Sequence, residues 1–345
     1  MKRKKKRIII IVISLLIILL LIIGVYFYGL TKVSKTHEKV EFNIKSGTNT
    51  KEIINNLYDS KLIKSKISSL IYIKLHNDIV IKAGSYELDR SYNTKKIFEI
   101  ISGGLVIDNS INVTFVEGKR LIDYVSVISD KFGYSEEDIL NTLSNKEYLQ
   151  KLINKYDFLS EDILNSDIYY PLEGYLFPDT YAFYKDASIE TIIEKMLDKT
   201  KKVLDNSNAS LSEKSIHEIL TIASIIESES MMQEDRSVVS QVIYKRLSLN
   251  MSLGMDVTSY YGVKKALSET LTSSDLNANN AYNTRRVDFI GLPVGPICNP
   301  SKASIEAALN PADTDYIYFY ADIKTGKLYF AKSYSEFQEL IRKYS

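Results

Sequence analysis

One carboxylate stands out because of its position on a predicted helix. Residues 212–229 carry apolar side chains at helical spacing, and Ile219, Ala223 and Ile226 share one face at about 100° per residue. Glu227 falls inside this apolar arc. Burial disfavours the charged form of a carboxyl group, and a protonated carboxyl can donate to a leaving oxygen. The pattern therefore indicates a general acid at Glu227, with a buried structural carboxylate paired to an arginine as the alternative.

Other carboxylates lie in turn-rich segments. Glu173 has aromatic neighbours, Tyr170, Tyr175 and Phe177, that could form a wall for stacking against sugar rings. The chain has 25 tyrosines and no tryptophan, so any aromatic platform has to use tyrosine or phenylalanine. Asp256 also stands in a turn-rich segment, where a carboxylate is more often a turn or cap residue than a catalyst.

Metal and cofactor chemistry find little support in the sequence. The three histidines are dispersed, and His217-Glu218 lacks the second histidine of a zinc-binding helix because Thr221 stands in its place. Lys324-Thr325-Gly326 resembles part of a penicillin-binding site, but the S-x-x-K and S-D-N elements that this chemistry needs are missing. We expect neither a metal nor a cofactor, and we interpret this tripeptide as a hairpin turn.

The N-terminus has the pattern of a membrane anchor. Six consecutive basic residues, 2–7, precede 23 uncharged and mostly apolar residues, 8–30. As a helix this stretch would reach roughly 34 Å, enough to cross the hydrocarbon core of a bilayer. No A-x-A-like cleavage site follows, which favours an anchor over a cleaved signal peptide. The basic flank predicts a single-pass protein of the bacterial cell membrane, with its N-terminus in the cytoplasm and residues 31–345 outside.

The composition narrows the possible partners. The formal net charge is +1, and the remainder of the chain is slightly acidic once the six N-terminal cations are set aside. This balance argues against nucleic acid as a partner, since nucleic-acid binders present a basic face. Cys298 is the only cysteine, so the chain forms no intramolecular disulfide.

Residue patterns predict a mixed α+β protein. Residues 31–39 are a polar linker, and residues 40–104 alternate between strand-like and helix-like segments. Residues 119–165 are mostly helical and charged, which fits a connecting subdomain. Residues 169–345 combine amphipathic helices with long loops, then a C-terminal β-hairpin over 316–321 and 327–331, and a final helix.

Several motifs occur in a fixed order behind the predicted anchor. They are LEGYLFPDTY at 172–181, ASIIE at 223–227, VIYKRL at 242–247, YG at 261–262, AYNT at 281–284, GLPVGPICNP at 291–300 and AALNPA at 307–312. Together they resemble the YceG-like family of endolytic murein transglycosylases over roughly residues 110–345. Residues 40–104 resemble the LysM-like module that precedes the catalytic region in this family. The resemblance implies a transglycosylase domain over 105–345, with a connecting subdomain (105–168) and a catalytic core (169–345).

The resemblance also implies a reaction. The family cuts the β-1,4 bond from N-acetylmuramic acid to N-acetylglucosamine within a peptidoglycan strand and leaves a 1,6-anhydromuramoyl end. Glu227 would protonate the glycosidic oxygen and then take the proton of the muramoyl C6 hydroxyl, which attacks C1. A second carboxylate is not required, because the substrate supplies the nucleophile. With the aromatic wall, the matching segments give a predicted substrate-binding set: Glu173, Tyr175, Asp256, Tyr282 and Asn283.

Some positions depart from the family pattern, and two other functions stay open. Ser228 replaces a usual lysine, Val257 replaces the proline of Asp-Pro-Thr, and Val294 replaces a common proline. A muramidase-type hydrolase would need a second carboxylate about 5–9 Å from Glu227, for which Glu173 and Asp256 are candidates. A non-catalytic peptidoglycan-binding scaffold would leave the glycan uncut.

The anchor suggests where the protein acts. Because a single helix would hold the site near the outer face of the cytoplasmic membrane, we expect it to trim nascent glycan strands. The expected partners are therefore peptidoglycan strands, the membrane and the peptidoglycan synthases.

Overall fold

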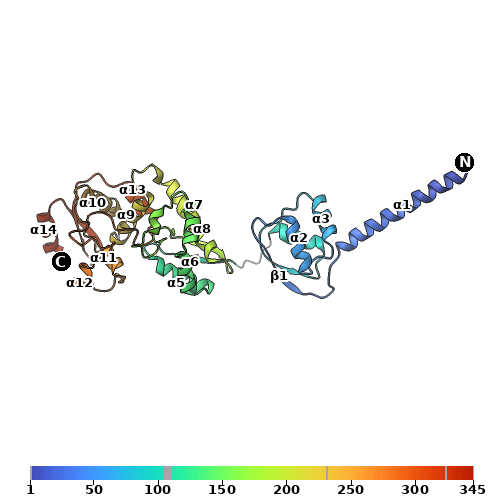
Figure 1. Ribbon diagram of the computed structural model, residues 1–345, viewed down its shortest axis with the longest axis horizontal. Coiled ribbons are helices and arrows are strands. Elements are labelled where there is room, and N and C mark those ends of the chain that lie inside the picture. The colour runs from blue at the N-terminus through green and yellow to red at the C-terminus, as the bar shows by residue number, and fades with distance from the viewer. Residues whose placement is uncertain (1, 105–109, 231, 323–324, 345) are drawn as a thin grey trace. The chain divides into compact units, whose positions relative to one another are not determined.

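The computed structural model describes residues 2–104, 110–230, 232–322 and 325–344, with side chains from Ile11 onward (Figure 1). The chain divides into two units, Met1–Ser110 and Ile111–Ser345, and each is described by itself. Both mix helices and strands, so the predicted mixed fold is confirmed, together with the N-terminal apolar helix and the C-terminal hairpin.

The first unit begins with α1 (Lys2–Gly29). Over Ile11–Gly29 the mean hydropathy is 3.0, and this helix is long and apolar enough to cross a bilayer. Its large apolar side chains are exposed to the surroundings of the protein. An exposed helix of this composition needs an apolar environment, which a membrane provides.

The rest of this unit is a small helix-and-strand module. Its elements are β1 (Lys39–Ile44), α2 (Thr50–Asp59), α3 (Lys66–Leu75), β2 (Gly84–Asp89) and α4 (Thr94–Gly103). β1 and β2 pair antiparallel, with Phe42 opposite Tyr86. Both of these aromatic residues are buried together with Leu57 and Ile97, so the helices and the strand pair share one core.

The second unit is mainly helical. Its strands are β3 (Ser110–Thr114), β4 (Thr180–Tyr184), β5 (Tyr318–Asp322) and β6 (Lys327–Ala331). Its helices are α5 (Leu121–Phe132), α6 (Glu136–Leu143), α7 (Lys146–Lys155), α8 (Ile189–Asn206), α9 (Ile216–Glu229), α10 (Arg236–Ser248), α11 (Asp256–Gly262), α12 (Ser273–Leu276), α13 (Lys302–Leu309) and α14 (Tyr334–Tyr344). Short 3-10 turns lie at Glu161–Leu164, Ala209–Leu211 and Gln233–Asp235.

Strand pairing in this unit connects distant and neighbouring segments. β3 pairs with β4, which joins the start of the unit to the loop after residue 170. β5 and β6 form the predicted hairpin, with Tyr318 opposite Ala331. Lys324, part of the tripeptide predicted to form its turn, lies outside the described residues.

Helix α9 is the centre of the second core. It begins with a capping box, in which Ser215 accepts from the Glu218 amide and the Glu218 carboxylate accepts from the Ser215 amide. Every side chain from Ile219 to Ile226 is buried, so this helix is enclosed on all sides and not only along its apolar arc. Thr221 and Ser224 tolerate this burial because their hydroxyl groups donate to backbone carbonyls within the helix.

Candidate active site

Glu227 lies in the last turn of α9, and its side chain is 6% exposed. One carboxylate oxygen, Oε2, accepts hydrogen bonds from the backbone amide (3.0 Å) and the hydroxyl of Ser301. The other, Oε1, accepts from Nη2 of Arg236 at 3.3 Å. Arg236 also donates to the Ser301 hydroxyl at 2.8 Å, so the three side chains form a closed hydrogen-bonded group.

Two helix starts supply these partners. Ser301 is the N-cap of α13, and Arg236 is the first residue of α10. The N-terminus of a helix carries partial positive charge, and Arg236 adds a full one. Both groups therefore hold the Glu227 carboxyl in a fixed orientation at the end of α9.

The loop between β3 and α5 passes close to Glu227. Gly118 has a φ of +72°, which favours glycine, and a Cβ atom there would lie 3.6 Å from Cγ of Glu227. The Gly118 amide donates to the Asn299 carbonyl at 2.9 Å, and the Asn299 amide donates to the Lys119 carbonyl at 3.0 Å. This loop is thus bonded to the segment that presents Ser301.

Asn299 fixes that segment from the other side as well. Its Oδ1 accepts from the amides of Gly174 and Leu176, both at 3.1 Å. Its Nδ2 contacts the Lys119 carbonyl and, at 3.4 Å, Oε1 of Glu173. The side chain is fully buried. Asn299 therefore connects the motif at 172–181 to the segment that holds the Glu227 carboxylate.

Glu173 is a buried acid in this framework. It is 1% exposed and accepts hydrogen bonds from the Leu121 amide (2.8 Å) and the Tyr261 hydroxyl (3.0 Å). Burial raises the pKa of Glu173 to about 8, although those two bonds and the charge of Arg120 lower it. A protein group thus faces each oxygen of this carboxyl.

Three other residues of the predicted substrate-binding set are also buried. Tyr175 bonds to Nδ1 of His217 through its hydroxyl at 2.9 Å. Tyr282 packs its ring against that of Tyr261, with centroids 4.7 Å apart. Asn283 donates to the carbonyls of Leu276 and Ala278 and accepts from the Ser259 hydroxyl. The structure brings Glu173 and Tyr282 together through Tyr261.

Asp256 is the exposed member of the set. Its side chain is 57% exposed and pairs with Arg285 at 3.2 Å. Asp256 is also close to Glu229, the last residue of α9, and its charge helps burial to raise the pKa of Glu229 to about 7. Local spacing in the sequence does not indicate that Glu229 and Asp256 lie close together, because they belong to different helices.

Sequence reasoning missed Arg236, Ser301 and Asn299. Ser301 carries a readable signal, since a serine directly before a helical segment is a typical N-cap. Arg236 and Asn299 carry no such signal, because their partners lie far along the chain or on another helix.

Cys298 adjoins the site as a buried thiol. Burial raises its pKa, and its Sγ lies 3.4 Å from the Ser224 carbonyl. A thiol of this kind is unreactive and acts in packing. No group of three or more metal-binding side chains occurs among the residues that the structure describes.

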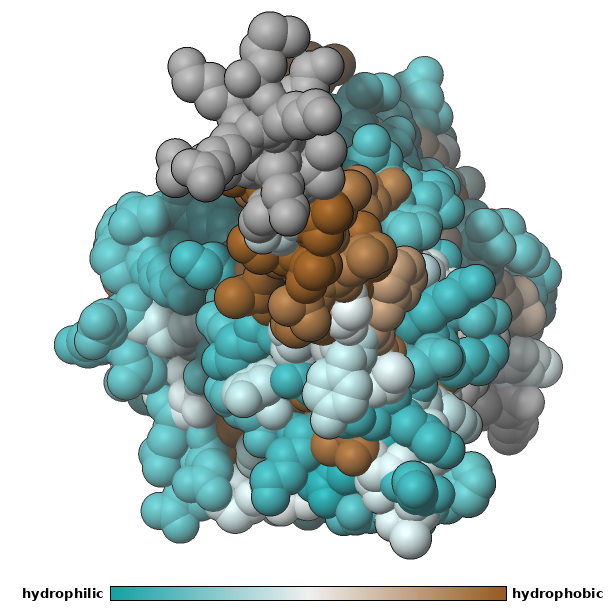
Figure 2. All heavy atoms as spheres, turned by 90° about the vertical axis from the view of Figure 1, so that its right-hand side faces the viewer, coloured by the Kyte–Doolittle hydropathy of each residue, from teal (hydrophilic) through white to brown (hydrophobic). Residues whose placement is uncertain are grey.

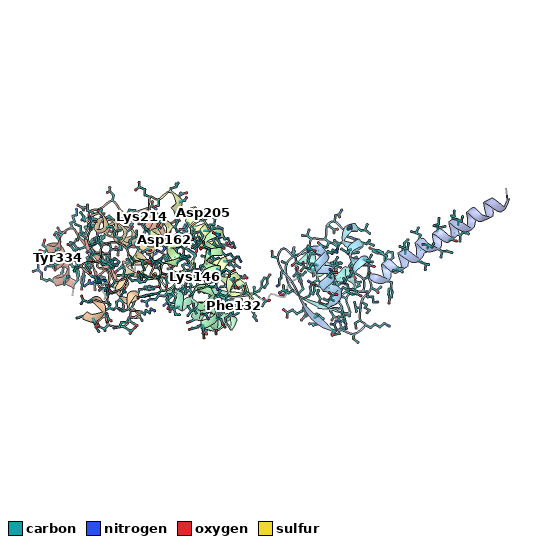
Figure 3. The ribbon with its side chains drawn as sticks, viewed as in Figure 1. Phe132, Lys146, Asp162, Asp205, Lys214 and Tyr334 are labelled. Carbon is teal, nitrogen blue, oxygen red and sulfur yellow. The ribbon has the colours of Figure 1, made fainter. Side chains whose placement is uncertain are left out.

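A hollow of about 1250 Å³ lies elsewhere in the second unit, between the end of α8, α10 and α13. Its lining includes Ser237, Tyr244 and Lys214, the last of which is labelled in Figure 3, but not Glu227. This hollow and the candidate catalytic carboxylate are therefore separate features.

A nearly buried carboxylate held by hydrogen bonds at two helix starts can serve acid–base chemistry, which makes the chain a candidate acid–base enzyme. The pairing of Glu227 with Arg236 is also what the structural alternative predicted, so the family assignment has to distinguish the two. The model of the YceG-like family matches residues 42–343, and the protein belongs to this family.

Similar proteins agree with this assignment. The chain is 33% identical to the endolytic murein transglycosylase of Bacillus subtilis (strain 168) over 331 residues, covering 93% of this chain and 90% of the relative. It is 30% identical to the endolytic murein transglycosylase of Streptococcus pneumoniae serotype 2 (strain D39) over 312 residues, or 85% of this chain and 56% of that protein. A crystal structure of a yceG-like protein of Listeria monocytogenes is 35% identical, with a TM-score of 0.63. The match covers 88% of this chain and all of that one.

Proposed function

We propose that this protein is a membrane-anchored endolytic lytic transglycosylase of peptidoglycan and that Glu227 is its acid/base. The observation that carries the proposal is the hydrogen-bonded group of Glu227, Ser301 and Arg236 in a chain whose relatives are named endolytic murein transglycosylases. The family motif that contains Glu227 supports the same residue.

The two carboxylate oxygens of Glu227 have different hydrogen-bond partners, so only one of them is assigned to proton transfer. Oε2 receives two hydrogen bonds from Ser301, whereas Oε1 receives one longer bond from Arg236. We assign Oε1 as the atom that gives a proton to the glycosidic oxygen as the C1–O bond breaks. The same oxygen then takes the proton of the muramoyl C6 hydroxyl as that hydroxyl bonds to C1, which closes the anhydro ring.

The substrate-binding set divides by exposure. Asp256 has an exposed carboxylate and is the member we assign to direct contact with glycan. The other four members are buried and bonded to protein groups, so we assign them to holding the site in shape. They are Glu173, Tyr175, Tyr282 and Asn283.

The domain plan and the location complete the proposal. Residues 1–30 are the cytoplasmic stub and anchor, 31–39 the linker, 40–104 a LysM-like module and 105–345 the transglycosylase domain. The catalytic domain then lies outside the cytoplasmic membrane, where it meets nascent strands beside the peptidoglycan synthases.

Digestion of purified peptidoglycan in water enriched in ¹⁸O tests the reaction. The full-length protein in detergent should produce 1,6-anhydromuramoyl ends without ¹⁸O, because the C6 hydroxyl and not water attacks C1. Reducing ends that carry ¹⁸O would show a muramidase-type hydrolase. Binding without new ends would show a non-catalytic scaffold.

A further inference from the structure

The end of α1 is built into the first unit. Gly29 is buried against α3, and a Cβ atom at this glycine would collide with Oγ of Ser68 and lie 2.8 Å from Cβ of Ser65. The next residue, Leu30, packs on the core of the unit, and its carbonyl accepts from the Thr94 amide at 3.0 Å. Because of these contacts, the C-terminal end of α1 is held against the start of α3.

An apolar stripe on α3 faces away from the core. Ile67, Ile71 and Leu75 follow one another at four-residue spacing and are 72%, 42% and 67% exposed. On a helical wheel this stripe directly adjoins the face of Ser68 and Tyr72, and Ser68 meets α1. The stripe therefore lies on the face of α3 next to the one that meets the end of α1. In Figure 2, which faces the α1 end, hydrophobic residues gather at the centre of the view.

Basic and aromatic residues lie near the end of α1 and on α3. Lys64 lies 4.5 Å from the ring centroid of Tyr28, near the end of α1, where aromatic residues gather at a membrane interface. α3 itself contains Lys66 and Lys74 and no acidic residue. Lys66 pairs with Asp59 at 3.4 Å, while Lys74 is exposed. A helix with an apolar face and basic neighbours is the type that lies in the interface of an anionic bilayer.

We propose that α3 lies in the headgroup region of the membrane that α1 crosses, with Ile67, Ile71 and Leu75 inserted among the lipid chains. The inference rests on the proposed anchoring of the protein and goes beyond it. The first unit would be seated on the lipid surface by two elements, a crossing helix and an interfacial helix. A single crossing helix alone would leave the unit free to tilt.

The absence of tryptophan makes a direct test possible. Single tryptophans can be introduced as I71W in the stripe, L20W in α1, and V287W, a 92% exposed position of the second unit. The full-length variants are reconstituted in bilayers of anionic and zwitterionic phospholipid whose acyl chains carry bromine at a shallow or a deep position. Emission of I71W should shift to the blue and be quenched most by the shallow bromine. L20W should be quenched most by the deep bromine, and V287W by neither.

Each other result overturns the inference in a recognisable way. Quenching of L20W without quenching of I71W would show an anchored protein whose α3 stays out of the lipid. A blue shift of I71W without quenching would show that protein, such as a second copy, covers the stripe. Loss of quenching in both variants would overturn the anchoring itself. As a second measurement, I67E and L75E in the I71W protein should abolish its quenching, whereas the same pair in the L20W protein should leave quenching there unchanged.

Discussion

At Glu227 the carboxylate receives its hydrogen bonds from the first turns of two helices, α10 and α13. Arg236 bonds to both Glu227 and Ser301, so it orients the acid and its other partner together. Replacing Arg236 therefore tests whether these hydrogen bonds to Glu227 matter for the reaction.

We expect Arg236→Gln to lower kcat. A hydrogen bond to a charged group contributes about 1.5–3 kcal/mol, which is roughly a ten- to hundredfold change in rate if it is lost in the transition state. The measurement is the initial rate of release of anhydromuramoyl ends. Arg342→Gln, an exposed change on α14, should keep the wild-type rate, and an Arg236→Gln protein as fast as that control would contradict the account.

Glu173 should make stability fall as the pH rises. Its pKa is raised from 4.5 to about 8 in the folded protein, so the native state holds a proton that the unfolded chain releases. The stabilisation is fully present below pH 4.5 and is lost between pH 4.5 and about 8, with a slope of at most about 1.4 kcal/mol per pH unit. Glu173→Gln keeps a neutral group of the same shape and should remove this part of the pH dependence.

Thermal unfolding of the full-length protein in detergent at pH 5.5 and pH 8.5 measures this effect. The loss of stability between the two pH values should be smaller in Glu173→Gln than in the wild type. Glu173→Ala should be less stable at both, because the Leu121 amide and the Tyr261 hydroxyl lose their acceptor. Equal losses in the wild type and Glu173→Gln would show that Glu173 does not hold a proton.

The sequence identified some of this chemistry at the residue scale but not all of it. Glu227 could be selected because its position in an apolar arc needs only local spacing. The bonds of Glu227 to Ser301 and of Glu173 to Tyr261 cross long stretches of chain, and local spacing carries no information on them. A run of aromatic residues in a turn-rich segment, as around Glu173, can equally belong to a surface wall or to a core.

At the scale of elements, the site depends on a loop that can approach α9 closely. Gly118 allows this approach because it adopts a positive φ and has no side chain near Glu227. The same loop is bonded to residue 299, so its position and that of Ser301 are coupled.

We expect Gly118→Val to lower kcat much more than the control Gly133→Val does, although both variants should lose a similar amount of stability. A branched side chain at a positive φ costs about 1–3 kcal/mol, and here it would also crowd Cγ of Glu227. Gly133→Val is the matched control, since Gly133 has a φ of +77° and no neighbour within 4 Å. Rates and melting temperatures of both variants separate strain from crowding. Equal effects of the two on kcat would exclude a special role for the loop.

Most elements were predictable because their periodicity and caps are local properties. The hairpin of β5 and β6 and the helices of the first unit follow their residue patterns. α9 is different, since a helical wheel gave one apolar face and the structure buries every side chain from Ile219 to Ile226. The pattern failed there because small hydroxyl residues can be buried when they bond to their own helix.

At the scale of the whole molecule, the anchor should decide which glycan is cut. A protein held at the membrane meets strands as they emerge, whereas a free protein also diffuses into older wall. We therefore expect cells in which residues 31–345 are exported without the anchor to have longer glycan strands than cells with the full protein at equal abundance. Strand lengths measured by chromatography, with full-length Glu227→Gln as the inactive reference, test this. Strands as short as those of the wild type would contradict it.

The most direct test of the account is the fate of anhydromuramoyl ends when Glu227 alone is changed. Peptidoglycan digested by the wild type and by Glu227→Gln is compared by mass spectrometry, with Glu218→Gln on the same helix as the control for loss of a carboxylate. We predict that the anhydromuramoyl ends vanish with Glu227→Gln and persist with Glu218→Gln. Ends that persist in a folded Glu227→Gln protein would contradict the assignment of the acid/base.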